Sequence, residues 1–182
     1  SFVESSTCSV EFDNSRGDGK ANVYVPAVGE DLKLYIYSID VADENAEVEL
    51  VMPVVLSNGE ENLSCFGVEM TPEGIIWMCI FNRNKIVGVD LKERKVVHEF
   101  NNVPCPNDLT IGPDGLLFIA GGKKISNPFT ADKDDKLLAV LPTQGAVYRI
   151  NISTSAMTLV SSPPGLGALA GIEYIDQHLY IT

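Results

Sequence analysis

The stretch VPCPNDLTIGPDGLLFIAGG, residues 103 to 122, holds the residues whose types and spacing point most directly to chemistry. Asn107 and Asp108 stand directly before a strand-like segment, and a Pro-Asp-Gly turn follows that segment at Pro113–Gly115. An amide beside a carboxylate can form the rim of a binding site. Pro, Asn and Asp are also ordinary turn residues, so the same letters fit a purely structural role. The rest of the chain has to distinguish these two interpretations.

Three other chemistries are disfavoured by their motifs. The two histidines, His98 and His178, occur without any G-x-S-x-G segment, so a Ser-His-Asp triad is not expected. The segment GLGALAG at 165–171 matches the letters of a dinucleotide fingerprint, but a strand pattern follows it where that motif needs a helix. The segment DNSRGDGK at 13–20 lacks the terminal acid of an EF-hand loop, and we interpret it as a solvated turn.

Composition restricts the partners. Hydrophobic residues make up 45% of the 182 residues and charged residues 21%, which is enough apolar material for a folded core. The formal net charge of −12 disfavours nucleic acid and anionic membrane surfaces as partners. No apolar run approaches the ~18 residues of a membrane-spanning helix, so membrane insertion is not expected either.

Cysteine spacing and sequons bear on the compartment. The chain has four cysteines, at Cys8, Cys65, Cys79 and Cys105. None of them forms a C-x-x-C pair, which argues against a zinc site or a redox motif. Asn62 and Asn151 begin N-x-[ST] sequons, so we favour a secreted or organelle-lumen location over the cytoplasm.

The elements that must position Asn107 and Asp108 are strands. The chain offers short segments that are rich in β-branched and aromatic residues and are bounded by Gly, Pro, Asn or Asp. They read NVYVPAV, LKLYIYSID, AEVELVMPVV, GIIWMCIF, KIVGVDL, KVVHEF, LLFIAG, GAVYRINI and AMTLVSS. No segment shows a long apolar stripe with the period of a helix. The sequence therefore predicts an all-β protein.

The strand pattern repeats. Residues 65–81, CFGVEMTPEGIIWMCIF, align without gaps with residues 106–122, PNDLTIGPDGLLFIAGG, at an offset of 41 residues. Residues 169–182, LAGIEYIDQHLYIT, form a third and more degenerate copy. Each copy predicts a strand, a tight turn and a second strand, and two more strands follow each of the first two copies. Four strands in about 40 residues are the pattern of one β-propeller blade.

We therefore predict a single partial β-propeller domain over residues 1–182. Its expected segments are a first visible blade at about 1–60, a second at 61–102, a third with a long insertion at 103–162, and the start of the next at 163–182. About three blades fall short of the four or more that a closed propeller needs. We expect that the remainder of the propeller is needed for closure and that this sequence is part of a longer protein.

The order PNDLTIGPDGLLFIAG, a long loop and then GAVYRINISTSAMTLV resembles the six-bladed propellers of the gluconolactonase/regucalcin family. Strictosidine synthase-like proteins and paraoxonases belong to the same broader group, and the resemblance covers about Cys65 to Thr182. It implies six blades when complete and a divalent cation, usually Ca²⁺, at the top of the central channel. It also implies hydrolysis of a small-molecule lactone or ester. On this resemblance Asn107 is a metal ligand, and Asp108 beside it is the catalytic candidate.

The register of the repeat tests whether the site residues that the resemblance implies are present in every copy. The ligand position lies four residues before a recurrent apolar residue, and Ile111 places Asn107 there. The equivalent position before Met70 is Phe66, and the third copy has Ala170 where the family pattern has Asn. Two functions therefore stay open: a calcium-dependent lactonase or esterase, and a non-catalytic propeller that serves as a protein-binding or structural subunit. A metal-independent, strictosidine synthase-like enzyme is a third alternative.

Overall fold

The computed structural model describes residues 11–13, 22–124, 129–131, 137–139, 144–165 and 167–182. Within these ranges the regular structure consists of strands β1 to β16 and two single-turn 3-10 helices, η1 (Phe81–Arg83) and η2 (Pro113–Gly115). The prediction of an all-β protein is confirmed.

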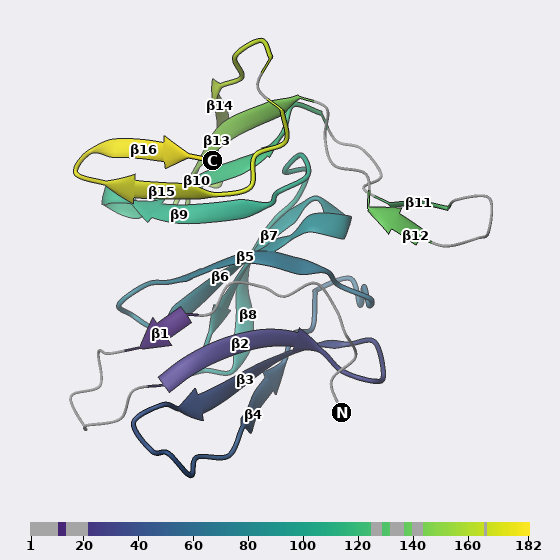
Figure 1. Cartoon of the computed structure of the whole chain (residues 1–182), viewed down its shortest axis with the longest axis vertical. Coiled ribbons are helices and arrows are strands. Elements are labelled where there is room, and N and C mark those ends of the chain that lie inside the picture. Colours follow the sequence, from purple (N-terminus) through teal and green to yellow (C-terminus); the bar gives the residue numbers. More distant parts are fainter. Residues whose placement is uncertain (1–10, 14–21, 125–128, 132–136, 140–143, 166) are drawn as a thin grey trace.

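The strands form three four-stranded antiparallel sheets and two hairpins (Figure 1). Sheet I contains β1 (Glu11–Asp13), β2 (Asn22–Val28), β3 (Leu34–Asp40) and β4 (Glu49–Pro53). Sheet II contains β5 (Cys65–Met70), β6 (Ile75–Ile80), β7 (Lys85–Asp90) and β8 (Lys95–Phe100). Sheet III contains β9 (Asp108–Gly112), β10 (Leu116–Gly122), β13 (Gly145–Asn151) and β14 (Met157–Ser161). Hairpin IV contains β15 (Ile172–Ile175) and β16 (His178–Ile181), and a separate hairpin contains β11 (Phe129–Ala131) and β12 (Leu137–Ala139).

The sheets are stacked face to face in chain order, with sheet I at one end of the long axis and hairpin IV near the other (Figure 1). Each sheet is a meander in which sequence neighbours pair, apart from the β11–β12 hairpin that interrupts sheet III between β10 and β13. Figure 1 shows that hairpin projecting away from the stack. The stack brings the first strands of sheets II and III and of hairpin IV, namely β5, β9 and β15, side by side.

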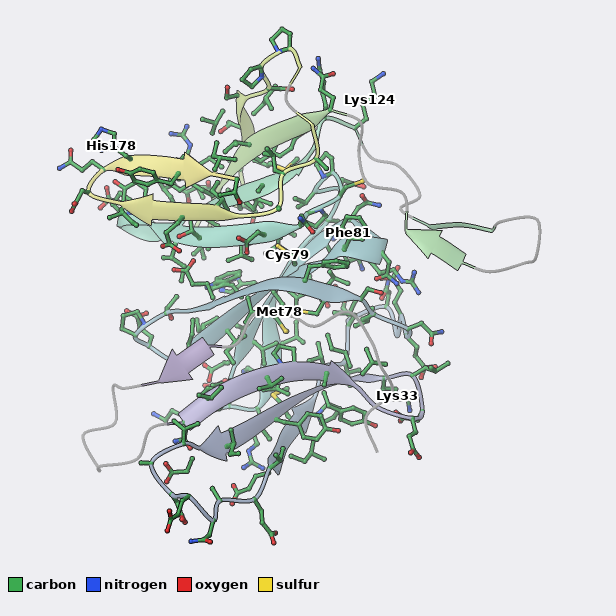
Figure 2. The ribbon with its side chains drawn as sticks, viewed as in Figure 1. Lys33, Met78, Cys79, Phe81, Lys124 and His178 are labelled. Atoms are coloured by element: carbon green, nitrogen blue, oxygen red, sulfur yellow. The ribbon has the colours of Figure 1, made fainter. Side chains whose placement is uncertain are left out.

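Strand β6 shows why the central sheet is so apolar. Successive side chains of a strand point to opposite faces of the sheet. Met78 packs in the cluster with sheet I, whereas Trp77 and Cys79 pack in the cluster with sheet III. Figure 2 shows Met78 and Cys79 on opposite sides of the sheet. Because both faces are covered, β6 is a continuous run of apolar residues rather than an alternating one.

Three apolar clusters hold the stack together. The largest lies between sheets I and II and includes Leu34, Ile36, Met52, Ile76, Met78, Ile80, Val87 and Val89. The second lies between sheets II and III and includes Trp77, Ile86, Leu117, Ile119, Ala146, Tyr148 and Ile150. The third lies between sheet III and hairpin IV and has only four buried members, Ala120, Val147, Leu169 and Ile172.

A polar network fastens the segment that joins sheets I and II. The ammonium of Lys85, which is buried, lies 2.7 Å from Glu60 Oε2 and 3.8 Å from Glu99 Oε2. Glu99 also accepts hydrogen bonds from the backbone N–H and the hydroxyl of Ser57, at 2.6 and 3.1 Å. Since a buried ammonium needs charged or polar partners, this arrangement positions the connecting segment on β7 and β8.

Candidate functional site

Asn107 and Asp108 lie where β9 begins, between β5 of sheet II and β15 of hairpin IV. The backbone N–H of Asn107 donates to Ala120 O within sheet III, and Asn107 O accepts from Gly67 N of sheet II, both at 2.9 Å. The Asn107 side chain points the other way and donates from Nδ2 to Leu169 O at 2.6 Å, with Ala170 O at 3.5 Å. Asn107 thus connects sheet II, sheet III and the segment that leads into hairpin IV.

The Asp108 carboxylate is bound to the same hairpin. Its Oδ2 accepts a hydrogen bond from Ile172 N, the first residue of β15, at 2.9 Å. Burial raises the pKa of the Asp108 carboxyl above its ordinary value, and the negative charge of Glu173 raises it further. The amides of Ile172 and Leu109 act in the opposite direction because they donate to the ionised form. The geometry makes Asp108 a partly desolvated carboxyl with a fixed backbone partner.

Glycines on both sides make room for Asp108. In the repeat, Gly67 and Gly171 occupy the position that Asp108 occupies in sheet III. A Cβ on Gly67 would lie only 2.5 Å from Asp108 Cα and 3.1 Å from Asn107 O. A Cβ on Gly171 would lie 2.8 Å from Thr182 Oγ1 and 3.6 Å from Asp108 Oδ2. Neither glycine was singled out by the sequence analysis, although the ungapped alignment of residues 65–81 with 106–122 already places Gly67 opposite Asp108.

Side chains, rather than a continuous ladder of backbone hydrogen bonds, link the neighbouring strands β5, β9 and β15. Glu69 Oε2 accepts from Ile111 N at 2.7 Å across sheets II and III. Thr110 Oγ1 accepts from Tyr174 N at 3.3 Å across sheet III and hairpin IV. Asp108 makes the equivalent bond to Ile172 N. These bonds satisfy backbone N–H groups that the edge of each sheet would otherwise leave without a partner.

A pocket of about 270 Å³ opens between these strands. Its lining comes from β5, β9 and β15 and consists of Val68, Glu69, Met70, Asp108, Leu109, Ile172 and Glu173. Glu173 Oε1 accepts a long hydrogen bond of 3.4 Å from the Thr110 hydroxyl. Among the described residues, no group of three or more His, Cys, Asp or Glu side chains is arranged to hold a metal ion. The carboxylates of the pocket are therefore spread along its wall, each beside a neighbouring strand.

The other sequence candidates lie away from this pocket. His98 is part of β8 and stacks on Trp77, with ring centroids 5.1 Å apart. His178 begins β16 at the exposed tip of hairpin IV, where Figure 2 labels it, and its Nδ1 lies 2.7 Å from Asp176 O. Cys65, Cys79 and Cys105 are buried thiols, whereas Cys8 and the Arg-Gly-Asp tripeptide at 16–18 lie outside the described residues.

No protein-family model and no curated protein matches this chain. Among solved structures it is similar to a chain of the nidogen/laminin complex, with a TM-score of 0.56 and 15% identity over 91% of this chain and 51% of that chain. The fold is β-propeller-like. This chain is also similar to Kuenenia stuttgartiensis hydrazine synthase (TM-score 0.43, 13% identity, 84% of this chain and 48% of that chain). A third similar structure is the virginiamycin B lyase from Staphylococcus aureus (TM-score 0.42, 14% identity, 99% and 78%).

The β-propeller-like chain spans about half the length of the first two of these structures. In a β-propeller-like fold, β5, β9 and β15 are the inner strands of their sheets. The pocket that these strands line therefore lies on the inner side of the sheets. The predicted fold class, an all-β and β-propeller-like fold, is confirmed. No helix in the described part of the chain is long and apolar enough to cross a bilayer.

Proposed function

We propose that this chain belongs to a non-catalytic β-propeller that serves as a protein-binding or structural unit. The observation that carries the proposal is the use of Asn107 and Asp108. The amide of Asn107 donates to Leu169 O at 2.6 Å and the carboxylate of Asp108 accepts from Ile172 N at 2.9 Å. Both side chains that could have formed the rim of a metal site fasten hairpin IV to sheet III.

The neighbouring repeat positions support the same interpretation. A calcium ion takes six to eight oxygen ligands, so one amide and one acid need further donors beside them. Phe66 and Ala170 stand at the two positions equivalent to Asn107 and offer no side-chain oxygen. The hydrogen bond of Asn107 Nδ2 also turns the amide so that a donor, and not an oxygen, faces the segment that leads into hairpin IV.

The substitution Asn107→Asp separates a structural role from a ligand role. It removes the donor to Leu169 O and places a carboxylate beside that carbonyl, so we expect the free energy of unfolding to fall by about 1–3 kcal/mol. A metal site would instead gain a charged oxygen and bind calcium more tightly. The measurement is thermal and urea unfolding of the parent protein and of the Asn107→Asp variant, each with calcium and with a chelator. Asn101→Asp is the matched control, because Asn101 is exposed.

A loss of stability that calcium does not reverse, together with no hydrolysis of a lactone or aryl ester above buffer, supports the non-catalytic unit. Asp108→Asn provides a second readout, because Asn keeps an oxygen that can accept from Ile172 N but removes the charge a cation needs. If Asn107→Asp raises the calcium-induced shift in melting temperature while Asp108→Asn abolishes it, the proposal is wrong.

The second candidate is a gluconolactonase/regucalcin-like hydrolase that uses Ca²⁺ or another divalent cation on a small lactone or ester. The specific observation in its favour is the pocket of about 270 Å³, which Glu69, Asp108 and Glu173 line from three neighbouring strands. In that case Asn107 would supply a ligand to the cation, and Asp108, whose pKa is raised, would take the proton of the attacking water and pass it to the leaving alcohol. Calcium-dependent hydrolysis that Asp108→Asn abolishes, with the fold intact by circular dichroism, would establish this candidate in place of the first.

A further inference from the structure

Another pocket, of about 330 Å³, lies between sheets I and II at their outer strands. One wall comes from β4 and the residues that follow it, and the other comes from β8 and the turn before it. Both sheets have four strands, and the chain continues from β4 to β5 and from β8 to β9, which begin the next sheets. This outer pocket is therefore a cleft between two complete sheets.

The floor of the outer pocket is apolar. Met52 of β4 belongs to the cluster between sheets I and II and is 6% exposed, and the half-buried Val96 of β8 packs against the same cluster. The rim is exposed, with Pro53 at the end of β4 and Val55, which is 64% exposed, just beyond it. An apolar group that enters the pocket would extend the cluster outward and remove the Val55 side chain from water.

The two ends of the outer pocket differ in charge. At one end Glu99 Oε1 accepts from Ser57 N at 2.6 Å, and Glu99 Oε2 lies 3.8 Å from the buried ammonium of Lys85. At the other end lie the exposed Arg94 and Lys95. Lys95 and Glu99 are the first and fifth residues of β8, so about 13 Å of extended strand separates the two ends. The carboxylate end already has its partners within the protein.

Arg94 is the cation of this pocket that is open to a partner. The ammonium of Lys95 forms an ion pair with Glu93. No hydrogen bond or ion pair joins the Arg94 guanidinium to another residue in the described part of the chain. The chain as a whole carries a formal net charge of −12, so a guanidinium without an internal carboxylate stands out. Its position at the edge of an apolar pocket favours a ligand that is apolar and carries an anionic group.

The exposed rim favours a protein segment over a small molecule. A small-molecule site encloses most of the surface of its ligand, whereas Pro53, Val55 and Arg94 are open to solvent. A peptide that crosses the rim covers these residues on both sides of the side chain that enters the pocket. Arg94 and Val96 are two positions apart in the chain, about 7 Å in an extended segment. An extended peptide matches this spacing when its carboxylate and its apolar side chain are also two positions apart.

We propose that the outer pocket, defined by Met52, Val55, Arg94 and Val96, binds an acidic segment of a protein partner. An apolar side chain of that segment enters between Val55 and Val96. A carboxylate two positions away from it pairs with Arg94. The inference rests on the proposed function as a protein-binding unit and names the surface and the chemistry of the partner.

The probe is an acetylated and amidated heptapeptide with leucine at its centre, aspartate two positions to either side, and glycine elsewhere. The two aspartates allow the peptide to bind in either chain direction. Amide chemical shifts of the chain are followed by NMR while the peptide is added. We expect shifts at Val55, Arg94 and Val96 with a dissociation constant on the order of 1 mM. Replacement of the leucine by glycine, or of both aspartates by asparagine, should weaken binding by about tenfold.

Variants of the protein complete the test. Arg94→Ala should weaken binding by about tenfold, whereas Lys92→Ala should change it by less than about twofold. Lys92 is a matched control because it is exposed in the same turn and carries the same charge but does not line the pocket. Val55→Asp should abolish the shifts, because it places a carboxylate on the rim. Val160→Asp on β14, where the side chain is 48% exposed, should leave them unchanged.

Three results would overturn the proposal. The first is that the glycine or the asparagine peptide binds as tightly as the probe. The second is that Lys92→Ala and Arg94→Ala weaken binding equally, because the attraction would then be to the charge of the turn as a whole. The third is that hexanoate causes the same shifts at least as strongly as the peptide, which would assign the pocket to a small apolar acid.

The outcome is separable from that of the proposed function. Calcium-dependent hydrolysis with intact peptide binding would reject the non-catalytic role and keep the outer pocket as an interface. Absence of shifts at Val55, Arg94 and Val96, with no hydrolysis and no calcium effect, would reject the interface alone.

Discussion

The contact between sheets II and III and the contact between sheet III and hairpin IV use the same positions of the repeat but different kinds of side chain. The first is built on large apolar side chains such as Trp77, Leu117 and Ile119, all essentially inaccessible to solvent. The second has a small apolar cluster and relies on hydrogen bonds to the backbone of the hairpin segment, in which the Asn107 side chain donates and the Asp108 and Thr110 side chains accept.

The difference separates two tasks. Apolar burial is non-directional and supplies most of the free energy of folding, so the II–III contact is the stronger one. Hydrogen bonds to backbone groups are directional and fix the position of one strand against the next, at about 1 kcal/mol each. The inner polar residues therefore determine where hairpin IV sits more than how strongly it is held.

Truncation of Trp77 and Phe118, which stand at equivalent positions of the repeat, should show the largest difference between the two contacts. Trp77→Ala should lower the free energy of unfolding by about 3–5 kcal/mol, because it opens a cavity in a closed interface. Phe118→Ala should cost about 1–2 kcal/mol, because its ring is only half-buried. Urea unfolding followed by far-ultraviolet circular dichroism measures both, since Trp77 is the only tryptophan. Equal losses would show that hairpin IV covers Phe118 as fully as sheet III covers Trp77.

Gly67→Ala tests how closely the inner strands approach each other. The added Cβ would lie 2.5 Å from Asp108 Cα, so backbone must move, and we expect a loss of about 1–3 kcal/mol. Gly167→Ala is the control, because a Cβ there has no neighbour within 4 Å. Combination with Asp108→Ala should not restore stability, because it removes the nearby side-chain oxygen Oδ1 of Asp108 but leaves Asp108 Cα and Asn107 O as obstructions. Recovery in the double variant would show that only the Asp108 side chain limits the space.

Thr110→Val isolates one directional bond. Valine has nearly the same shape but cannot accept from Tyr174 N, so a partly buried amide loses its partner and stability should fall by about 1–2 kcal/mol. Thr158→Val on β14, where the side chain is exposed, should change stability by less than about 0.5 kcal/mol. Hydrogen exchange at the Tyr174 amide gives a local readout and should become faster. Unchanged exchange there would mean that the hydroxyl does not hold this strand.

The strands and the repeat could be predicted from the sequence because they depend on local patterns. The predicted segment NVYVPAV is β2, KVVHEF is β8, and the alignment at an offset of 41 residues superimposes the inner hairpins of sheets II and III. That alignment also placed Asn107 correctly, at the start of an inner strand. Turn residues, period-2 alternation and repetition are sufficient for this level of structure.

The partners of Asn107 and Asp108 could not be predicted, because they depend on how the sheets are spaced. Leu169 O lies 62 positions further along the chain than Asn107, and no local pattern specifies that contact. The pairing of Gly67 with Asp108 was visible in the alignment as two aligned letters. Its meaning depends on how closely the two strands approach, since a Cβ added to Gly67 would lie 2.5 Å from Asp108 Cα, and only the packed sheets define that approach.

The smallest expected effect is the pH dependence of stability that comes from two partly buried acids, Asp108 and Glu60, and its sign is opposite for the two. Burial raises the pKa of Asp108 above its ordinary value of 3.8, so its contribution to stability is fully present below that value and is lost as the pH rises through the folded-state pKa. Hydrogen bonding to Lys85 lowers the pKa of Glu60, so its contribution is present above the ordinary value of 4.5 and is lost as the pH falls.

Asp108→Asn and Glu60→Gln should therefore change the stability profile in opposite directions. Asp108→Asn keeps an acceptor for Ile172 N without the cost of burying a charge, so it should match the parent in acid and exceed it at neutral pH. Glu60→Gln should be less stable than the parent at neutral pH and approach it in acid. Urea unfolding at a series of pH values, with a chelator present throughout, measures both differences. A parent that is more stable than Asp108→Asn at neutral pH would mean that the charge of Asp108 stabilises the contact with hairpin IV, and that this interface is more electrostatic than its hydrogen bonds alone imply.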